Sequence, residues 1–126
     1  VLFGVWFFTG RVDMSDVKNG KVIFQYGDDD YENIYENILT DLSEEDLNAI
    51  KKIFDNKKLG KDNPSCGFSK NIAILLNDGS QVYCIARDTC GIIYYKNEDK
   101  YFGISDEENI VLRTLLEKYG FHFPCV

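Results

Sequence analysis

Two serines that precede acidic runs constrain the fold of this chain more than any other feature. Ser43 comes before the acidic residues 44–46, and Ser105 comes before the acidic residues 106–108. A serine hydroxyl can accept a hydrogen bond from a free amide of the first helical turn, and carboxylates stabilise the positive end of a helix. Each run therefore predicts the start of an α-helix.

Apolar residues and stop signals complete both helices. Apolar residues recur at helical spacing after each serine, at Leu47, Ile50, Ile53 and Phe54 in the first helix and at Ile110, Val111, Leu112, Leu115 and Leu116 in the second. The first pattern ends in lysines and Gly60, and the second ends at Lys118-Tyr119-Gly120. The two similar helix starts are two independent capping boxes or the trace of a duplicated strand–strand–helix unit.

Turn dipeptides divide the rest of the chain into short segments rich in β-formers. Asn19-Gly20 separates residues 12–18 from 21–26, and Asp78-Gly79 separates 72–77 from 80–85. Both dipeptides tolerate the positive φ angles of a tight hairpin. Residues 97–100 separate 92–96 from 101–104, and residues 27–30 precede 31–39, for which we favour a strand over a helix.

The expected architecture is one α+β domain over residues 1–126. It has an antiparallel meander sheet of about six to seven strands, with the two capping-box helices packed on one face. The other face is left solvated or used for binding. Adjacent strand residues point to opposite faces, so only one of Tyr94 and Tyr95 can be in the core, and the same holds for Tyr101 and Phe102. Exposed tyrosines are typical of binding surfaces, so we name Tyr94, Tyr95 and Tyr101 as binding candidates.

Charge excludes some partners. The net charge is −7 and the isoelectric point is about 4.6, which argues against nucleic acid and anionic lipid and suits a basic protein. The apolar run 1–8 is too short to span a bilayer, so we expect no direct membrane insertion.

Four cysteines, at positions 66, 84, 90 and 125, leave several states open. If residues 86–88 form a three-residue hairpin loop, Cys84 and Cys90 lie opposite each other within bridging distance. Cys66 or Cys125 could anchor an end of the chain, and the spacing selects no pairing. Four free thiols, or a zinc site that adds His122, are the alternatives, although the paired spacing of zinc ribbons is missing.

Two further kinds of site are weighed. Asp28, Asp29, Asp30 and Glu32 could ligate calcium, but a solvated acidic turn explains them better because the EF-hand pattern is incomplete. The sequence gives even less support for a catalytic site. The single histidine limits any triad to one base, and the sequence has neither a nucleophile elbow nor a phosphate-binding glycine loop. We therefore expect no cofactor, and binding rather than catalysis.

Three motifs resemble those of a group of small bacterial proteins. They are the stretch 63–69 (Asn-Pro-Ser-Cys-Gly-Phe-Ser), the run Cys84-Ile85-Ala86 with Asp88 and Cys90, and the ending Tyr119-Gly120-Phe121 with Phe123-Pro124-Cys125-Val126. The likeness covers about residues 43–126. The group has no assigned activity, but some of its members look exported or lipid-anchored, which would suit disulfides.

The expected function is that of a non-enzymatic bacterial binding domain, extracellular or on the cell surface, whose partner is a protein. Inhibitors and immunity-type proteins belong to this class, because acidic surfaces neutralise basic active sites. A cytoplasmic thiol or zinc-site protein is the first alternative, and a small hydrolase is the second.

Overall fold

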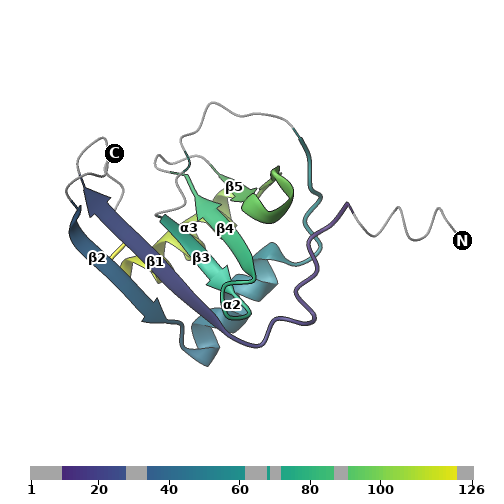
Figure 1. Ribbon diagram of the computed structural model, residues 1–126. Helices are drawn as coiled ribbons and strands as arrows, with labels where there is room; N and C mark the ends of the chain where they lie inside the picture. The colour runs from purple at the N-terminus through teal and green to yellow at the C-terminus, as the bar shows by residue number, and fades with distance from the viewer. Residues whose placement is uncertain (1–9, 28–33, 62–67, 69–71, 87–90, 122–126) are drawn as a thin grey trace, which may run out of the picture.

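The computed structural model describes residues 10–27, 34–61, 68, 72–86 and 91–121. Six strands form one antiparallel sheet in the order β2-β1-β3-β4-β5-β6 (Figure 1). The strands are β1 (Gly20–Gly27), β2 (Ile34–Asp41), β3 (Ile72–Leu76), β4 (Gln81–Ile85), β5 (Ile92–Tyr95) and β6 (Lys100–Gly103). Helix α2 (Glu44–Phe54) follows β2, a 3₁₀ turn η1 (Lys96–Glu98) follows β5, and helix α3 (Asp106–Glu117) follows β6. The predicted α+β class is confirmed.

The sheet is a meander from β3 to β6. At the other end, β1 and β2 form an antiparallel pair, and β3 then adds to β1 rather than to β2. Helix α2 lies between β2 and β3 in the chain, which allows the chain to pass β2 and return next to β1. β2 is therefore an edge strand, and the helices lie behind the sheet in Figure 1.

Both predicted helix starts are confirmed. The Ser43 hydroxyl accepts from the Asp46 amide at 3.2 Å, and the Ser105 hydroxyl accepts from the Glu108 amide at 3.1 Å. The Glu108 carboxylate also accepts from the Ser105 amide at 2.9 Å, so α3 has the complete capping box. Helix α2 ends before Gly60, because Asn56 adopts a left-handed φ of 63° just after the cap residue.

The hairpin predicted at Asn19-Gly20 is wrong. Gly20 is the first residue of β1, and β1 pairs with β2 and β3 instead of with residues 12–18. A Cβ atom at Gly20 would lie 2.8 Å from the Leu76 side chain, so the glycine permits close packing rather than a turn. Asn19 instead supports the β3–β4 turn, where its Oδ1 accepts from the Asp78 amide at 2.8 Å.

The turns at Asp78-Gly79 and at residues 97–100 are confirmed. Asn77, Asp78 and Gly79 have φ angles of 51°, 58° and 84° between β3 and β4, and Asp99 has a φ of 54° between η1 and β6. β2 also confirms the choice of a strand for the described part of residues 31–39.

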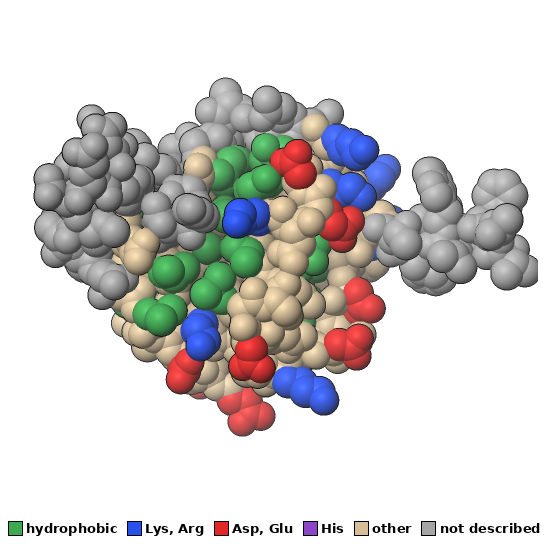
Figure 2. Space-filling model, in the orientation of Figure 1, with side chains coloured by type: hydrophobic (Ala, Val, Ile, Leu, Met, Phe, Trp, Pro, Cys, Tyr) green, Lys and Arg blue, Asp and Glu red, His purple; other side chains and the backbone are tan. Residues whose placement is uncertain are grey.

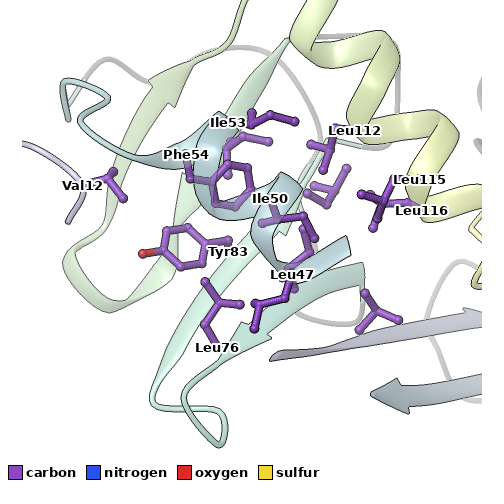
Figure 3. Close-up of a cluster of buried hydrophobic side chains, with 14 of the residues drawn as sticks. Val12, Leu47, Ile50, Ile53, Phe54, Leu76, Tyr83, Leu112, Leu115 and Leu116 are labelled. Carbon is purple, nitrogen blue, oxygen red and sulfur yellow. The ribbon is translucent and has the colours of Figure 1, made fainter. Parts of the chain in front are cut away.

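Buried side chains from β1, β3, β4, β5 and β6 meet the two helices in one core, part of which is drawn in Figure 3. The sheet contributes Val22, Phe24, Ile72, Ile74, Leu76, Tyr83, Ile85, Ile93 and Phe102, and the helices contribute Leu47, Ile50, Ile53, Phe54, Leu112, Leu115 and Leu116. Ile110 and Val111, which were expected in the same stripe as the leucines of α3, are 59% and 52% exposed. With about 100° between successive helical residues, one face cannot hold five apolar residues in a span of seven.

The two helices run antiparallel and are joined at both ends. The Lys57 ammonium lies 2.9 Å from the Glu108 carboxylate, where α2 ends and α3 begins. The Lys118 ammonium lies 2.9 Å from the Asp46 carboxylate, where α2 begins and α3 ends. Both helices therefore cover the same face of the sheet and leave its other face without a helix.

Candidate functional site: the open face of the sheet

A row of paired residues crosses the face of the sheet that the helices leave open. One residue of each strand belongs to it, because each residue pairs directly with the next across the ladder. The members of this open-face row are Leu39, Ile23, Ala73, Cys84, Tyr94 and Tyr101. All six are apolar or aromatic, although alternation usually makes a solvated sheet face polar.

The row is exposed at its Leu39 end, half-buried at its Tyr101 end and buried in the middle. Leu39 is 61% exposed on β2, and Ile23, Tyr94 and Tyr101 are half-buried. Ala73 and Cys84, the small central members, are buried. Figure 2 shows hydrophobic side chains gathered over this face, with charged side chains around them. An apolar patch with charged neighbours is typical of a protein-interaction surface.

Three aromatic rings are packed together at the β5–β6 end of the row. The ring centroids of Tyr94 and Tyr101 are 4.9 Å apart, and the Phe68 ring lies 5.8 Å from Tyr94 and 5.6 Å from Tyr101. Contacts of this kind stabilise aromatic pairs in tilted geometries. They hold the rings in place before any partner arrives, which lowers the entropy cost of binding.

A hydrogen bond to Asp99 of the same chain orients the Tyr94 ring. The Tyr94 hydroxyl donates to Asp99 Oδ1 at 2.8 Å, and this hydrogen bond, with burial and the Asp99 charge, raises the pKa of Tyr94 to about 12. Tyr94 therefore keeps its proton at neutral pH and presents a neutral ring. The left-handed backbone of Asp99, at the end of η1, places its carboxylate where Tyr94 can reach it.

Tyr95 does not belong to this surface. Its ring stacks on Tyr83 with centroids 4.8 Å apart and planes 15° apart, on the face that the helices cover. Phe102 is likewise buried there, while Tyr101 faces the opposite way. The expectation that one residue of each adjacent pair faces outward is confirmed, and Tyr95 is corrected from a binding candidate to a core neighbour.

Cys84 is a free, buried thiol, and the predicted Cys84–Cys90 geometry is wrong. The ladder pairs Cys84 with Tyr94 and Ile85 with Ile93, so the connection between β4 and β5 is longer than a three-residue loop. Burial raises the pKa of Cys84 to about 11, against a small opposing effect of the Lys96 charge. A protonated, inaccessible thiol is a poor nucleophile and a poor metal ligand.

The remaining predicted site residues lie outside the described residues. They are the acidic group Asp28, Asp29, Asp30 and Glu32, the cysteines Cys66, Cys90 and Cys125, and His122. Calcium binding, zinc binding and disulfides through these residues stay predictions. Within the described residues, no three His, Cys, Asp or Glu side chains gather as metal ligands would.

Apart from the open-face row, a groove lies between the start of β1 and α2. This groove of about 730 Å³ is lined by the lysines at 18, 21 and 51 and by the acids at 41, 44 and 78, together with Val17, Asn19, Gly20, Leu42, Leu47 and Asn48. Charges of both signs are mixed in it, and its lining includes neither a histidine nor a cysteine. The lining thus offers no Cys-His pair, whereas its lysines and carboxylates belong to residue types that can act as nucleophiles or bases.

Three comparisons with known proteins found no match. No protein-family model matches this chain, and neither the curated proteins nor the solved structures gave a match. Among the described residues, the structure contains no helix with the length and apolar character needed to cross a bilayer. The candidate site therefore depends on geometry alone.

Proposed function

We propose that this chain is a non-enzymatic binding domain that contacts a protein partner through the open-face row. The observation that carries the proposal is the apolar composition of the whole row across six strands, buried at its centre and accessible toward its ends, with a fixed aromatic group at one end. Tyrosine rings held by their neighbours supply contact area at low entropy cost, and they often dominate the binding energy of interfaces.

The partner in this proposal carries a basic surface. The net charge of −7 favours encounter with a positively charged protein over a negatively charged one. Asp99 places a carboxylate directly beside the Tyr94 ring, where a lysine or arginine could contact both groups. An inhibitor or immunity-type protein has this combination of properties, so we place the domain in that class.

The proposed setting is bacterial and outside the cytoplasm, at the cell surface or beyond it. Its support is the resemblance of residues 43–126 to small bacterial proteins, some of which look exported. The cytoplasmic thiol or zinc-site alternative gains nothing from Cys84, whose thiol is buried and protonated. The groove beside β1 has neither a histidine nor a cysteine in its lining, so it supplies no Cys-His pair for the hydrolase alternative.

Affinity capture with matched variants tests this function. The immobilised domain is exposed to extracts and medium of the cells that produce it, as wild type, as the double variant Tyr94→Ala/Tyr101→Ala, and as Val111→Ala. Val111 is a control because it is also an exposed apolar side chain but lies on α3. We expect the wild type and the control to retain a basic protein that the double variant loses.

The result is interpretable only if the double variant is folded. Its circular dichroism spectrum should match that of the wild type and its melting should stay cooperative, although at a lower temperature because two half-buried rings that pack on each other are removed. Equal capture by all three proteins would contradict a role of the open-face row. Failure to retain any protein across a range of salt concentrations would contradict the binding function itself.

A further inference from the structure

The outward face of α3 carries apolar side chains that the core does not use. Ile110 and Val111 are 59% and 52% exposed, whereas Leu112 and Leu116 are fully buried. Figure 3 shows the leucines of α3 extending toward the buried side chains of α2. At about 100° per residue, Ile110, Val111 and the exposed Thr114 lie together on the side opposite these leucines. Single exposed aliphatic residues are ordinary, but an adjacent pair on one helical stripe forms a patch.

Charged residues of opposite sign flank this patch. Glu107 lies one turn before it, and Lys118 lies one turn after Thr114, both exposed and on the same side of the helix. Glu107 and Lys118 are equally far from the midpoint between Val111 and Thr114. The stripe is therefore complementary to itself when a second helix is laid across it in the opposite direction.

We infer that the outward face of α3 binds α3 of a second copy of this chain in an antiparallel pair. A two-fold axis then passes through the midpoint of the stripe. Val111 then faces Thr114 of the second copy, and Ile110 of the second copy lies one turn away along the same stripe. Glu107 faces Lys118 of the second copy at each end, so both charged pairs are attractive, whereas a parallel pair would bring like charges together.

Lys118 can contribute to this contact without leaving its own helix pair. Its ammonium donates to Asp46 of α2 at 2.9 Å, yet its side chain is still 60% exposed. An ammonium has three donors, so one contact with Asp46 leaves others for Glu107 of the second copy. Glu107 itself has no ion pair among the described residues.

The association should be weak. Two aliphatic side chains per copy make a patch well below the size of stable interfaces, and exposed ion pairs add little. We expect a dissociation constant on the order of 0.1 mM, which becomes measurable at high concentration or when the copies are held close together. The inference is independent of the proposed function, because α3 lies on the opposite side of the sheet from the open-face row.

Sedimentation velocity and equilibrium of the purified protein test the pair. Between about 10 µM and about 1 mM, the wild type should shift from monomer toward dimer. Val111→Lys should remain monomeric over the same range, and Lys52→Glu on α2 should behave as the wild type. The double variant Tyr94→Ala/Tyr101→Ala should also dimerise as the wild type does, which separates this contact from the proposed function.

A charge exchange distinguishes this pair from unspecific association. Glu107→Lys alone and Lys118→Glu alone each place like charges opposite each other, so each variant should be monomeric. Their equimolar mixture restores attraction at both ends and should form heterodimers. Because Lys118 also contacts Asp46, melting curves must first show that Lys118→Glu is folded; if it is not, Val111→Lys decides. A monomeric wild type at about 1 mM, a dimeric Val111→Lys, or a mixture of folded variants that stays monomeric would overturn the inference.

Discussion

Gly79 and Gly120 both adopt a left-handed backbone, but their surroundings differ. Gly79 has a φ of 84° in the β3–β4 turn, and a Cβ atom there would meet open space. Gly120 has a φ of 97° just after α3, and a Cβ atom there would lie 2.5 Å from Ile38 Cδ1. The same left-handed backbone conformation thus forms an open turn at Gly79 and a close contact with β2 at Gly120.

Alanine at these two positions should separate backbone strain from steric overlap. Gly79→Ala should lower the free energy of unfolding by about 1 kcal/mol, the typical cost of a left-handed alanine. Gly120→Ala should lower it by about 2 kcal/mol or more, since Ile38 must also move. Urea denaturation of both variants measures the difference, and equal losses would contradict the close packing of Gly120 on Ile38.

Burial determines the chemistry of Cys84. The thiol is 1% exposed, and burial raises its pKa from 9.0 to about 11. At pH 8, the reactive thiolate is then about 100-fold rarer than in an unfolded chain.

Alkylation of Cys84 at pH 8 should therefore be at least about 100-fold slower in the native protein than in urea. Peptide mass spectrometry follows the modification of this residue separately from the other cysteines. Labelling at comparable rates in both states would show that the thiol is accessible and would revive the reactive-thiol alternative.

At the scale of elements, a buried carboxylate holds the two helices together. Asp46 accepts from the Tyr119 hydroxyl at 2.6 Å and from the Lys118 ammonium at 2.9 Å. Burial acts to raise the pKa of Asp46, but hydrogen bonds from Tyr119, Lys118 and Ser43, with the Lys118 charge, outweigh it and hold the pKa below the ordinary 3.8. The ionised form is thus favoured by folding.

Stability that depends on Asp46 should disappear in acid. A carboxyl group whose pKa is lower in the folded state contributes above its unfolded pKa, near 3.8, and loses this contribution as the pH falls through the folded pKa. Asp46→Asn should be less stable than the wild type by about 1–3 kcal/mol at pH 7, and the gap should shrink below pH ~4.

Urea denaturation at several pH values measures this gap, with Glu45→Gln as the control for an exposed acid on the same helix. A gap that stays constant from neutral pH to strong acid would contradict the assignment, because the ionised carboxylate would then not be the group that stabilises the helix pair.

Local sequence signals predict most of these elements, and the wrong predictions concern residues whose structure is determined by contacts with distant parts of the chain. The serine caps act within one helical turn, so Ser43 and Ser105 were readable from the sequence. The turn prediction at Gly20 is wrong because this glycine allows close packing against Leu76, which is distant in the chain. The open-face row depends on the register of six strands, and Tyr94 opposite Tyr101 was the only part within reach of a local pattern.

At the scale of the whole molecule, the described strands and helices are ordered in a similar way on either side of the β3–β4 pair. A hairpin lies at each end of the sheet, β1–β2 and β5–β6, and each leads through a serine cap into a helix. Corresponding hydrogen bonds join Leu42 to Gly20 at 2.9 Å and Ile104 to Gly91 at 2.8 Å. These likenesses extend the similarity of the two helix starts. They are compatible with a duplicated strand–strand–helix unit and equally with two units that acquired the same helix cap independently.

This arrangement gives the domain two different outer surfaces. Both helices cover one face of the sheet, and the open-face row crosses the other, so each surface can meet a different neighbour without competition. The central claim is that the open-face row is the surface that recognises a protein partner. Asp99 and the net charge of −7 favour a partner that has a basic surface.

Site-specific photo-crosslinking in the producing cells tests this claim most directly. A photoreactive phenylalanine analogue replaces Tyr101 in one protein and Lys52, an exposed residue of α2, in another. Irradiation should yield a discrete adduct with a basic protein from position 101 and none from position 52. An adduct from position 52 alone, or none from either position, would contradict recognition through the open face of the sheet.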